Sequence, residues 1–306
     1  MDTMLPSQQD RVVVVLVRAR NPSNIGAAAR ALHDLGFSRL RIVNEFPVPF
    51  AAAKSAVDAS SVLETAQEFS TVAAAIADCA LVFGTTAVGE RVLEHPLHLL
   101  PEAAEIIRSQ LSLNPKTQIA LLFGSEKTGL SNHDLSHCHA LLTVPMNPGS
   151  GERHLSMNLG QAVAVCLYAI ATAAGALRLA SETWDRTTTN DPLPHSSQPH
   201  RDEWVATEPR ATAADLERLT TLLRDVLAAS GYTRRNPANS RETTLRRLIR
   251  RMALSASDAA VWTGILRQIQ LALVAPAGVP VETETPPIPS HNESKIASGV
   301  QIARKL

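Results

Sequence analysis

The sequence has few aromatic residues, few cysteines and no excess of charge. Phe, Trp and Tyr make up only 4% of the 306 residues, which argues against an RNA-binding domain that stacks bases on aromatic side chains. The three cysteines, Cys79, Cys138 and Cys166, are too few for a disulfide framework, and we expect them to stay reduced. Lys+Arg and Asp+Glu both number 29, so a uniformly basic nucleic-acid binder is excluded, although a local basic patch is not.

The chain also lacks a pattern for secretion. Its first eleven residues show no basic segment followed by an apolar one, so we expect a cytoplasmic protein. The longest apolar stretch, Leu159 to Ala180, is long enough to cross a bilayer, but it is rich in alanine rather than leucine or isoleucine. We therefore expect a buried or subunit-interface helix there, and no membrane span.

Short apolar runs alternate with helical patterns in the first part of the chain. Residues 11–17 form a β-branched run that is typical of a strand buried on both faces. A helix over 24–35 and a strand over 39–43 complete a strand–helix–strand unit. Further strands are predicted over 80–83, 118–123 and 140–144, and further helices over 71–78, 132–138 and about 155–180. The sequence therefore predicts an α/β fold with a parallel sheet in a domain over residues 1–184.

The composition changes after Trp184. Residues 185–211 contain four prolines among Ser, Thr and Asp, which predicts a linker. Helical periodicity returns over residues 212–272 and predicts a small all-α domain. Residues 273–306 are rich in Pro, Glu and Ser and are predicted to be disordered.

The predicted all-α domain carries a local excess of positive charge. Eleven arginines stand against five acidic residues between positions 210 and 270. A solvated surface would account for this excess, but contacts to RNA phosphates account for it better, because arginine clusters typically make such contacts. We therefore predict an RNA-binding extension.

The loop after the first predicted strand indicates the kind of ligand. It lacks the Gly-x-Gly-x-x-Gly pattern, so a standard dinucleotide site is excluded. Asn24 and Arg30 lie near the start of the helix that follows, where an amide and a fixed cation suit a phosphate or a sugar hydroxyl. By themselves, the two residues also fit a helix cap and a solvent-facing arginine.

Two more loops carry polar residues where strands end. Glu126 lies between Gly124 and Gly129, and ligands of α/β sheets bind at the carboxyl ends of the strands. Ser156 and Asn158 stand at the start of the last helix, where both residue types also serve as ordinary caps. Each motif alone fits an ordinary glycine turn or helix cap.

A group of histidines and a cysteine after the second motif raises the question of a metal site. His133 and His137 are four residues apart, and Cys138 and His139 come next. A zinc site needs a third or fourth ligand at a fixed geometry. We expect no metal.

Taken together, the three motifs resemble those of the SpoU/TrmH branch of the SPOUT methyltransferases. That family has Asn-x5-Arg, then Phe-Gly-x-Glu-x-x-Gly-Leu, then Ser-x-Asn-Leu, which match residues 24–30, 123–130 and 156–159. The resemblance covers about residues 10–180. The Val-Phe-Gly-Thr-Thr-Ala run at 82–87, the Cys-His pair at 138–139 and the helical extension indicate the TrmJ-type subgroup. The loop between Asn147 and Ser156 departs from the subgroup pattern, because it is longer than that subgroup usually carries.

The resemblance implies a fold and an activity. The expected fold is a parallel α/β sheet with a C-terminal trefoil knot, in an obligate homodimer formed through the last helix of the knot. The expected cofactor is S-adenosylmethionine, and the expected reaction is 2′-O-methylation of RNA ribose. The favoured target is a pyrimidine in the tRNA anticodon loop, at nucleotide 32. A sister enzyme acting on rRNA and a catalytically silent RNA-binding protein are the alternatives.

The resemblance also assigns residues by position. The predicted catalytic residues are Arg30, Asn24, Glu126, Ser156 and Asn158. The predicted cofactor-binding residues are Thr85, Thr86, Ala87, Gly124, Val144, Leu155, Ser156 and Met157. A guanidinium is a poor base, so we expect Arg30 to position the ribose and stabilise charge rather than remove a proton.

Overall fold

Strand β1 (Val12–Val17) shows why the chain folds around a parallel sheet. In the computed structural model all six of its residues are fully buried. Val12, Val14 and Leu16 belong to one hydrophobic cluster, whereas the three residues between and after them belong to a second cluster. Because alternate side chains of a strand point to opposite faces, both faces of the sheet are covered. The uninterrupted apolar run is the pattern of such a strand.

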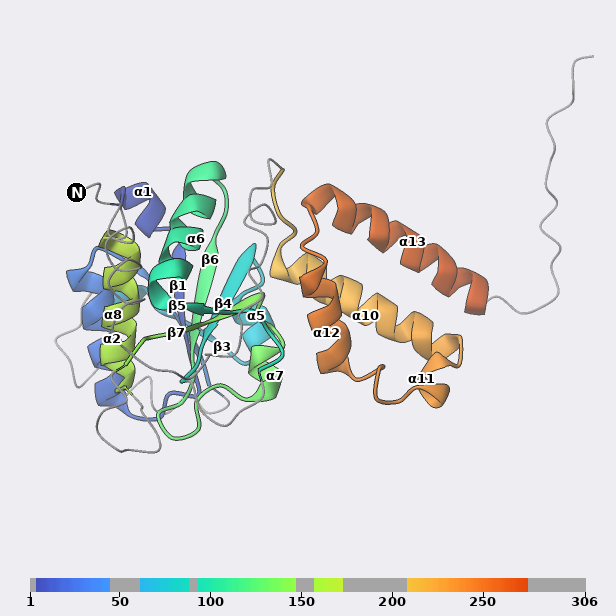
Figure 1. Cartoon of the computed structure of the whole chain (residues 1–306), viewed down its shortest axis with the longest axis horizontal. Helices are drawn as coiled ribbons and strands as arrows, with labels where there is room; N and C mark the ends of the chain where they lie inside the picture. The colour runs from blue at the N-terminus through green and yellow to red at the C-terminus, as the bar shows by residue number, and fades with distance from the viewer. Residues whose placement is uncertain (1–3, 45–60, 88–92, 147–156, 173–207, 275–306) are drawn as a thin grey trace, which may run out of the picture. The chain divides into compact units, whose positions relative to one another are not determined.

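The structure describes residues 4–44, 61–87, 93–146, 157–172 and 208–274, all within one compact unit that spans 1–274. In these ranges seven strands form one parallel sheet in the order β3-β2-β1-β6-β4-β7-β5 (Figure 1). Besides β1, the strands are β2 (Arg39–Val43), β3 (Gln67–Phe69), β4 (Leu81–Thr85), β5 (Leu97–Leu99), β6 (Ile119–Phe123) and β7 (Ala140–Thr143). The predicted α/β fold with a parallel sheet is confirmed. The edge strands β3 and β5 were not predicted, because three residues are too few to show a periodicity.

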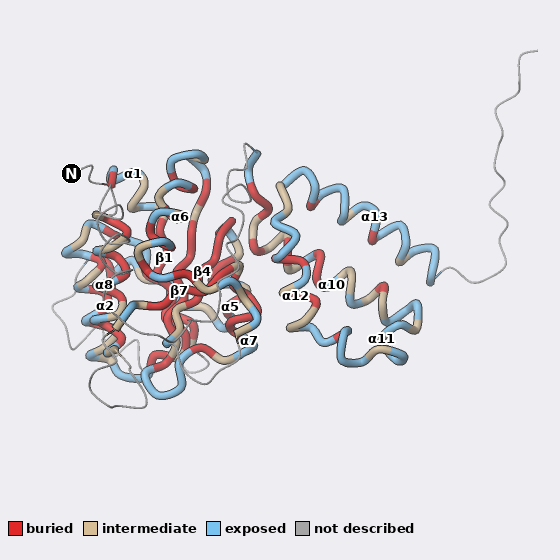
Figure 2. The backbone as a smooth tube through the Cα atoms, viewed as in Figure 1, coloured by how far each residue is buried: buried red, intermediate tan, exposed pale blue. Residues whose placement is uncertain are grey.

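Helices cover both faces of the sheet (Figures 1 and 2). One face packs against α2 (Pro22–Asp34), α4 (Ser61–Thr65), α6 (Leu100–Leu113) and α8 (Leu159–Thr172). The other face packs against α5 (Val72–Ala75) and α7 (Asn132–Leu135). The short helix α1 (Pro6–Gln9) precedes β1. Helices α2 and α8 approach closely, since a Cβ atom on Gly160 would lie 2.6 Å from the Cβ of Ala27.

The four helices predicted in the sheet domain differ in extent from those observed. The helix predicted over 24–35 is α2, which begins two residues earlier and ends one residue earlier. The helix predicted over 71–78 is α5, which ends at Ala75 because Ile76 leaves the helical region of φ and ψ. The helix predicted over 132–138 is α7, which ends at Leu135. The helix predicted over 155–180 begins at Leu159, and residues 155–156 and 173–180 lie outside the described residues.

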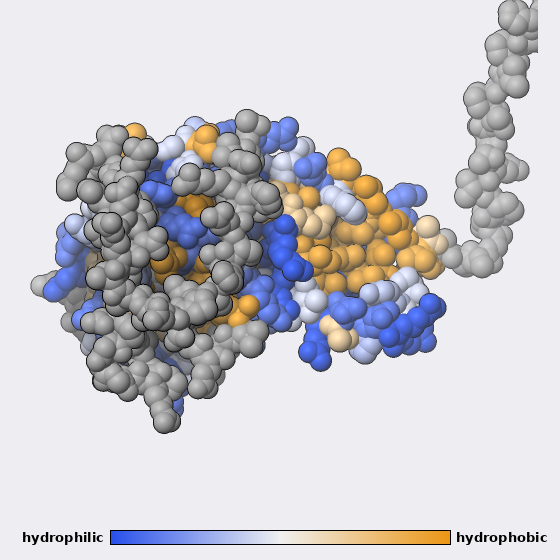
Figure 3. Space-filling model, in the orientation of Figure 1, coloured by the Kyte–Doolittle hydropathy of each residue, from blue (hydrophilic) through white to orange (hydrophobic). Residues whose placement is uncertain are grey.

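Four helices follow residue 208: α10 (Ala213–Ala229), α11 (Tyr232–Arg235), α12 (Glu242–Arg251) and α13 (Ala256–Val274). Thr212 caps α10, and Asp215 completes a capping box with it. Leu219, Ile249 and Leu266 share a small hydrophobic cluster. Much of α13 remains exposed, including Trp262. The exposed surface of this helix is largely hydrophobic (Figure 3). No helix in the described ranges combines the length and the apolarity needed to cross a membrane.

Candidate functional site

A cavity of about 400 Å³ lies at the carboxyl ends of three neighbouring strands, β6, β4 and β7. We call it the strand-end cavity. Segments that follow these strands line it, and α8 contributes Leu159, Ala162 and Cys166. Because ligands of parallel α/β sheets bind at this edge, the cavity is the place where a cofactor is expected. Six residues of the predicted cofactor set line it: Thr85, Thr86, Ala87, Gly124, Val144 and Met157. The other two, Leu155 and Ser156, lie outside the described residues.

The segment Phe123–Leu130 forms one wall of the strand-end cavity. It folds back on itself, and Ser125 and Gly129 form an isolated bridge. A Cβ atom on Gly124 would lie 2.1 Å from the carbonyl carbon of Gly129, so only glycine fits there. Gly129 has a φ of +65°, which favours glycine for a second reason. The two glycines that flank Glu126 in the sequence therefore set the shape of this wall.

A chain of hydrogen bonds joins the three sequence motifs at the cavity. The Nδ2 of Asn158 donates to the Oδ1 of Asn24 at 3.0 Å. The Nδ2 of Asn24 donates to the Oε1 of Glu126 at 2.9 Å, and Glu126 itself lines the cavity. The Oδ1 of Asn158 accepts the N–H of Gly160 in the first turn of α8. Both amides are thus oriented by two partners each, and three of the predicted catalytic residues lie together.

Backbone donors also hold the carboxylate of Glu126. The N–H groups of Arg20 and Asn21 each lie 3.4 Å from one of its oxygens. Burial raises the pKa of Glu126, but the hydrogen bonds from Asn24 and from these backbone groups outweigh it and bring the pKa below its usual value. Glu126 is therefore ionised at neutral pH and acts as an acceptor.

The structure does not bring Arg30 into this chain of hydrogen bonds. Arg30 lies on α2, is exposed, and is not among the residues that line the strand-end cavity. Because Arg30 is exposed, its side chain is accessible to a polyanion in solvent. Ser156, the remaining predicted catalytic residue, lies outside the described residues.

Sequence reasoning missed several residues of the site. The α8 side chains that line the cavity gave no signal, because small apolar residues look alike on a buried helix. Lys127 and Thr128 lie within the second motif and also line the cavity, yet they were not singled out. The ion pair of Arg18 with the buried Asp134 was missed because its partners are 116 residues apart.

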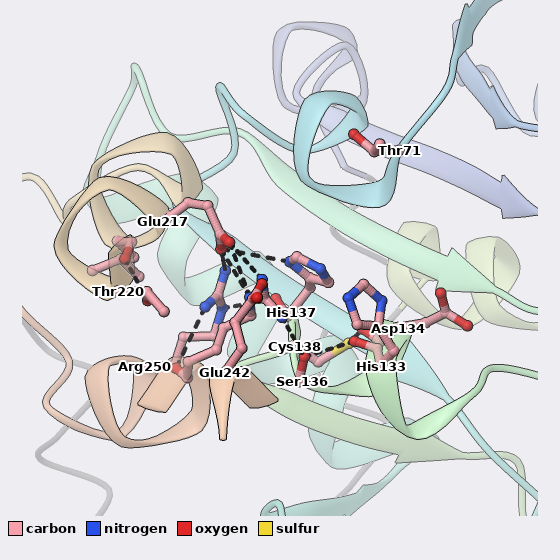
Figure 4. A network of polar contacts seen from close by, with 12 residues as sticks. Thr71, His133, Asp134, Ser136, His137, Cys138, Glu217, Thr220, Glu242 and Arg250 are labelled. Carbon is pink, nitrogen blue, oxygen red and sulfur yellow. Dashed lines mark hydrogen bonds and ion pairs between the residues drawn. The ribbon is translucent and has the colours of Figure 1, made fainter. Parts of the chain in front are cut away.

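A polar network around two buried arginines joins α12 and α10 to the residues that follow α7 (Figure 4). The guanidinium of Arg246 binds Glu217 at 2.6 Å and also Glu242, and donates to the Oγ of Ser136 at 3.1 Å. The Nε of Arg250 donates to the backbone carbonyl of His137 at 3.0 Å. Both arginines are at most 4% exposed. The network therefore attaches the helices after residue 208 to the sheet.

This burial corrects the interpretation of the arginine excess. Arg210, Arg246 and Arg250 are buried and cannot contact RNA phosphates from these positions. Seven of the other arginines are exposed. Arg218 and Arg224 pair with nearby acidic side chains, and the rest are Arg234, Arg235, Arg241, Arg251 and Arg267.

The cysteines and histidines of the described ranges do not form a metal cluster. No three of the described His, Cys, Asp and Glu residues gather as metal ligands. His133 and His137 instead pack edge to face, with ring centroids 5.4 Å apart. The three cysteines are buried and unbonded to one another.

Comparison with known proteins identifies the family. Residues 11–168 match the model of the SpoU rRNA Methylase family. The tRNA (cytidine/uridine-2′-O-)-methyltransferase TrmJ of Salmonella choleraesuis (strain SC-B67) is 31% identical over 259 residues, which are 84% of this chain and 95% of the relative. The chain belongs to the SpoU methylase family. The membership that the three motifs predict is thereby confirmed.

Further relatives share both the sequence and the fold. The TrmJ of Escherichia coli O1:K1 / APEC is also 31% identical, over 84% of this chain and 94% of its own length. The crystal structure of TrmJ from Z. mobilis ZM4 superposes with a TM-score of 0.63 at 29% identity, covering 84% of this chain and 98% of that one. Both matches extend well beyond residues 11–168, the part that the SpoU family model covers.

Proposed function

We propose that this chain is an S-adenosylmethionine-dependent methyltransferase that modifies ribose 2′-hydroxyl groups of RNA. The proposed target is a pyrimidine in the tRNA anticodon loop. The observation that carries the proposal is the hydrogen-bonded chain of Asn158, Asn24 and Glu126 at the strand-end cavity. The tRNA substrate rests on the relatives named TrmJ, which match along most of this chain.

The strand-end cavity fits a ligand of the size and chemistry of S-adenosylmethionine. Its volume of about 400 Å³ falls within the range typical of small-molecule sites. Its lining combines apolar side chains, such as Leu142 and Val144, with the hydroxyl groups of Thr86 and Thr128. When bound, the cofactor supplies a methyl group on a sulfonium. Thr85, Thr86, Ala87, Gly124, Val144, Leu155, Ser156 and Met157 are the residues proposed to hold it.

The polar residues of this chain would orient the ribose. Asn24 and Asn158 present fixed amides, and the ionised Glu126 fixes the first of them. Alignment of a nucleophile with its target is a large part of catalysis. Arg30 is proposed to bind the RNA near the reacting ribose, because its guanidinium is exposed on the same helix as Asn24. Ser156 is proposed to complete the site.

The remaining features complete the proposal. The C-terminal part of the sheet domain is proposed to form a trefoil knot, and α8 to form the interface of a homodimer. Val165 and Tyr168 on α8 are exposed in the single chain, as a subunit-interface helix requires. Helices α10 to α13 are proposed to form an RNA-binding domain in a cytoplasmic enzyme. The exposed arginines named above would supply its phosphate contacts.

Methyl transfer to defined RNA pools tests the proposed function. Purified protein is incubated with methyl-labelled S-adenosylmethionine and either bulk tRNA or bulk rRNA, and mass spectrometry maps the modified nucleotides. We expect 2′-O-methylation of a tRNA pyrimidine, abolished by Glu126→Gln. The matched control is Glu68→Gln, which makes the same change on the exposed edge strand β3. If only rRNA is methylated, the proposed tRNA substrate is wrong. If the protein binds RNA but transfers no methyl group, the proposed methyltransferase activity is wrong.

A further inference from the structure

The turn between β1 and α2 begins in an unusual backbone conformation. Arg18, the first residue after β1, has a φ of +55°, in the left-handed region that is disfavoured for residues with a Cβ atom. Such a conformation persists only where the surrounding structure enforces it. The N–H of Arg18 donates to the carbonyl of Val43 at 2.8 Å. The side chain of Arg18 forms an ion pair with Asp134.

Asp134 joins this turn to the start of α7. Its side chain is only 2% exposed. The carboxylate accepts hydrogen bonds from both terminal nitrogens of Arg18, and the distance from Nη1 to Oδ1 is 3.1 Å. The same carboxylate accepts the N–H and the hydroxyl of Ser131 at 2.7 and 2.6 Å, which completes the capping box of α7. Figure 4 shows Asp134 pointing away from the cluster of Glu217, Glu242 and Arg250. Asp134 therefore serves the turn and not the buried network.

The same turn holds Glu126. The two N–H groups that face its carboxylate belong to Arg20 and Asn21, which follow Arg18 by two and three residues. Their direction depends on the path that the backbone takes as it leaves Arg18. Segment 125–130, which carries Glu126, leads directly into α7, which carries Asp134. The ion pair thus connects the turn whose N–H groups face Glu126 to the helix that follows the segment carrying Glu126.

We propose that Arg18 and Asp134 are positioning residues, whose ion pair aligns Glu126 with Asn24 for methyl transfer. The inference rests on the proposed function, since it assigns a role within that site. Neither residue lines the strand-end cavity, so neither is expected to contact the methyl donor.

Two variants separate the ion pair from other roles of these residues. Asp134→Asn keeps an oxygen that can accept from Ser131, so the cap of α7 is retained while the charge is lost. Arg18→Gly adopts a positive φ without strain, so the turn is permitted while the side chain is lost. Because a displacement of about 1 Å can lower turnover about 100-fold, we expect kcat to fall about 10- to 100-fold in both. The Kd for S-adenosylmethionine, measured by calorimetry, should stay within about twofold.

A second readout does not depend on methyl transfer. The pKa of Glu126 can be followed by carbon NMR of carboxyl-labelled protein and assigned with Glu126→Gln. We expect it to rise in Asp134→Asn and Arg18→Gly, because the backbone donors that lower it would be displaced. A merely structural role of the ion pair would leave this pKa unchanged.

Asp78→Asn is the matched control. Asp78 forms a comparable two-armed pair with the buried Arg41, at 2.5 and 2.7 Å, but it lies before β4, at the amino ends of the strands. This variant should lose stability while the kcat and the pKa of Glu126 stay as in the wild type. If Asp134→Asn behaves like Asp78→Asn, the positioning role is refuted. If the wild-type protein methylates no RNA, the proposed function fails, and the pKa of Glu126 still decides whether the ion pair positions it.

Discussion

Acidification is expected to destabilise the protein through His137, which lies between α7 and the buried arginines. The side chain is 2% exposed, and burial lowers its pKa to about 3, an effect to which the charges of Arg246 and Arg250 add. Glu217, whose carboxylate lies 3.8 Å from the Nδ1, opposes this shift only in part. His137 is therefore neutral in the folded protein at any pH above about 4.

The magnitude follows from the unfolded state. An unfolded histidine titrates near its usual pKa of about 6.5, so between that pH and about 3 the unfolded state binds one proton more than the folded state. Stability then rises with pH across this window and is lost on acidification. A pH of 5.0 lies about 1.5 units below the pKa of the unfolded histidine. Each unit of this difference adds about 1.4 kcal/mol to the stability of the unfolded state relative to the folded state. Lowering the pH from 7.5 to 5.0 should thus cost about 2 kcal/mol from His137 alone.

Urea unfolding at the two pH values measures this effect. His95 and His139, whose pKa values burial also lowers, contribute in the same direction, so the wild type alone cannot isolate His137. In His137→Gln the loss of stability between pH 7.5 and 5.0 should be smaller than in the wild type by about 2 kcal/mol. Comparing each variant with itself at two pH values cancels the packing change. An equal loss in both proteins would refute the reasoning.

Three further predictions concern the candidate site. Asn24→Ala removes both amide hydrogen bonds, one of them to an ionised carboxylate, and should lower kcat about 10- to 100-fold in a methylation assay. Asn132→Ala, the same change at an exposed position, should leave kcat unchanged. Gly124→Ala places a Cβ atom on the backbone of Gly129 and should weaken S-adenosylmethionine binding at least about tenfold by calorimetry; unchanged affinity would show that the loop can move aside. Arg30→Ala should lower methyl transfer about 100-fold with the cofactor Kd nearly unchanged, and normal turnover would remove Arg30 from the site.

Local pattern was sufficient for the five longer strands of the sheet and for the positions of the three motifs. The apolar run of β1 predicts a strand covered on both faces, and its alternate side chains do enter two different clusters. Glycines at 124 and 129 indicate a tight turn after a strand, and the backbone there leaves no space for a Cβ at Gly124. These features depend on neighbours in the sequence, which is why the sequence shows them. The edge strand β5 is too short for its pattern to be recognised.

What the sequence by itself determined is therefore the alternation of strands and helices and the placing of Asn24, Glu126 and Asn158 at the ends of elements. Only the tertiary structure decided that these side chains meet, because the hydrogen bonds join residues 102 and 134 positions apart. It also decided that Arg246 is buried rather than available to RNA. An arginine on an amphipathic helix has the same local pattern in either case. Its exposure depends on which distant element packs over it, and here Glu217 of α10 and Ser136, which follows α7, enclose the guanidinium.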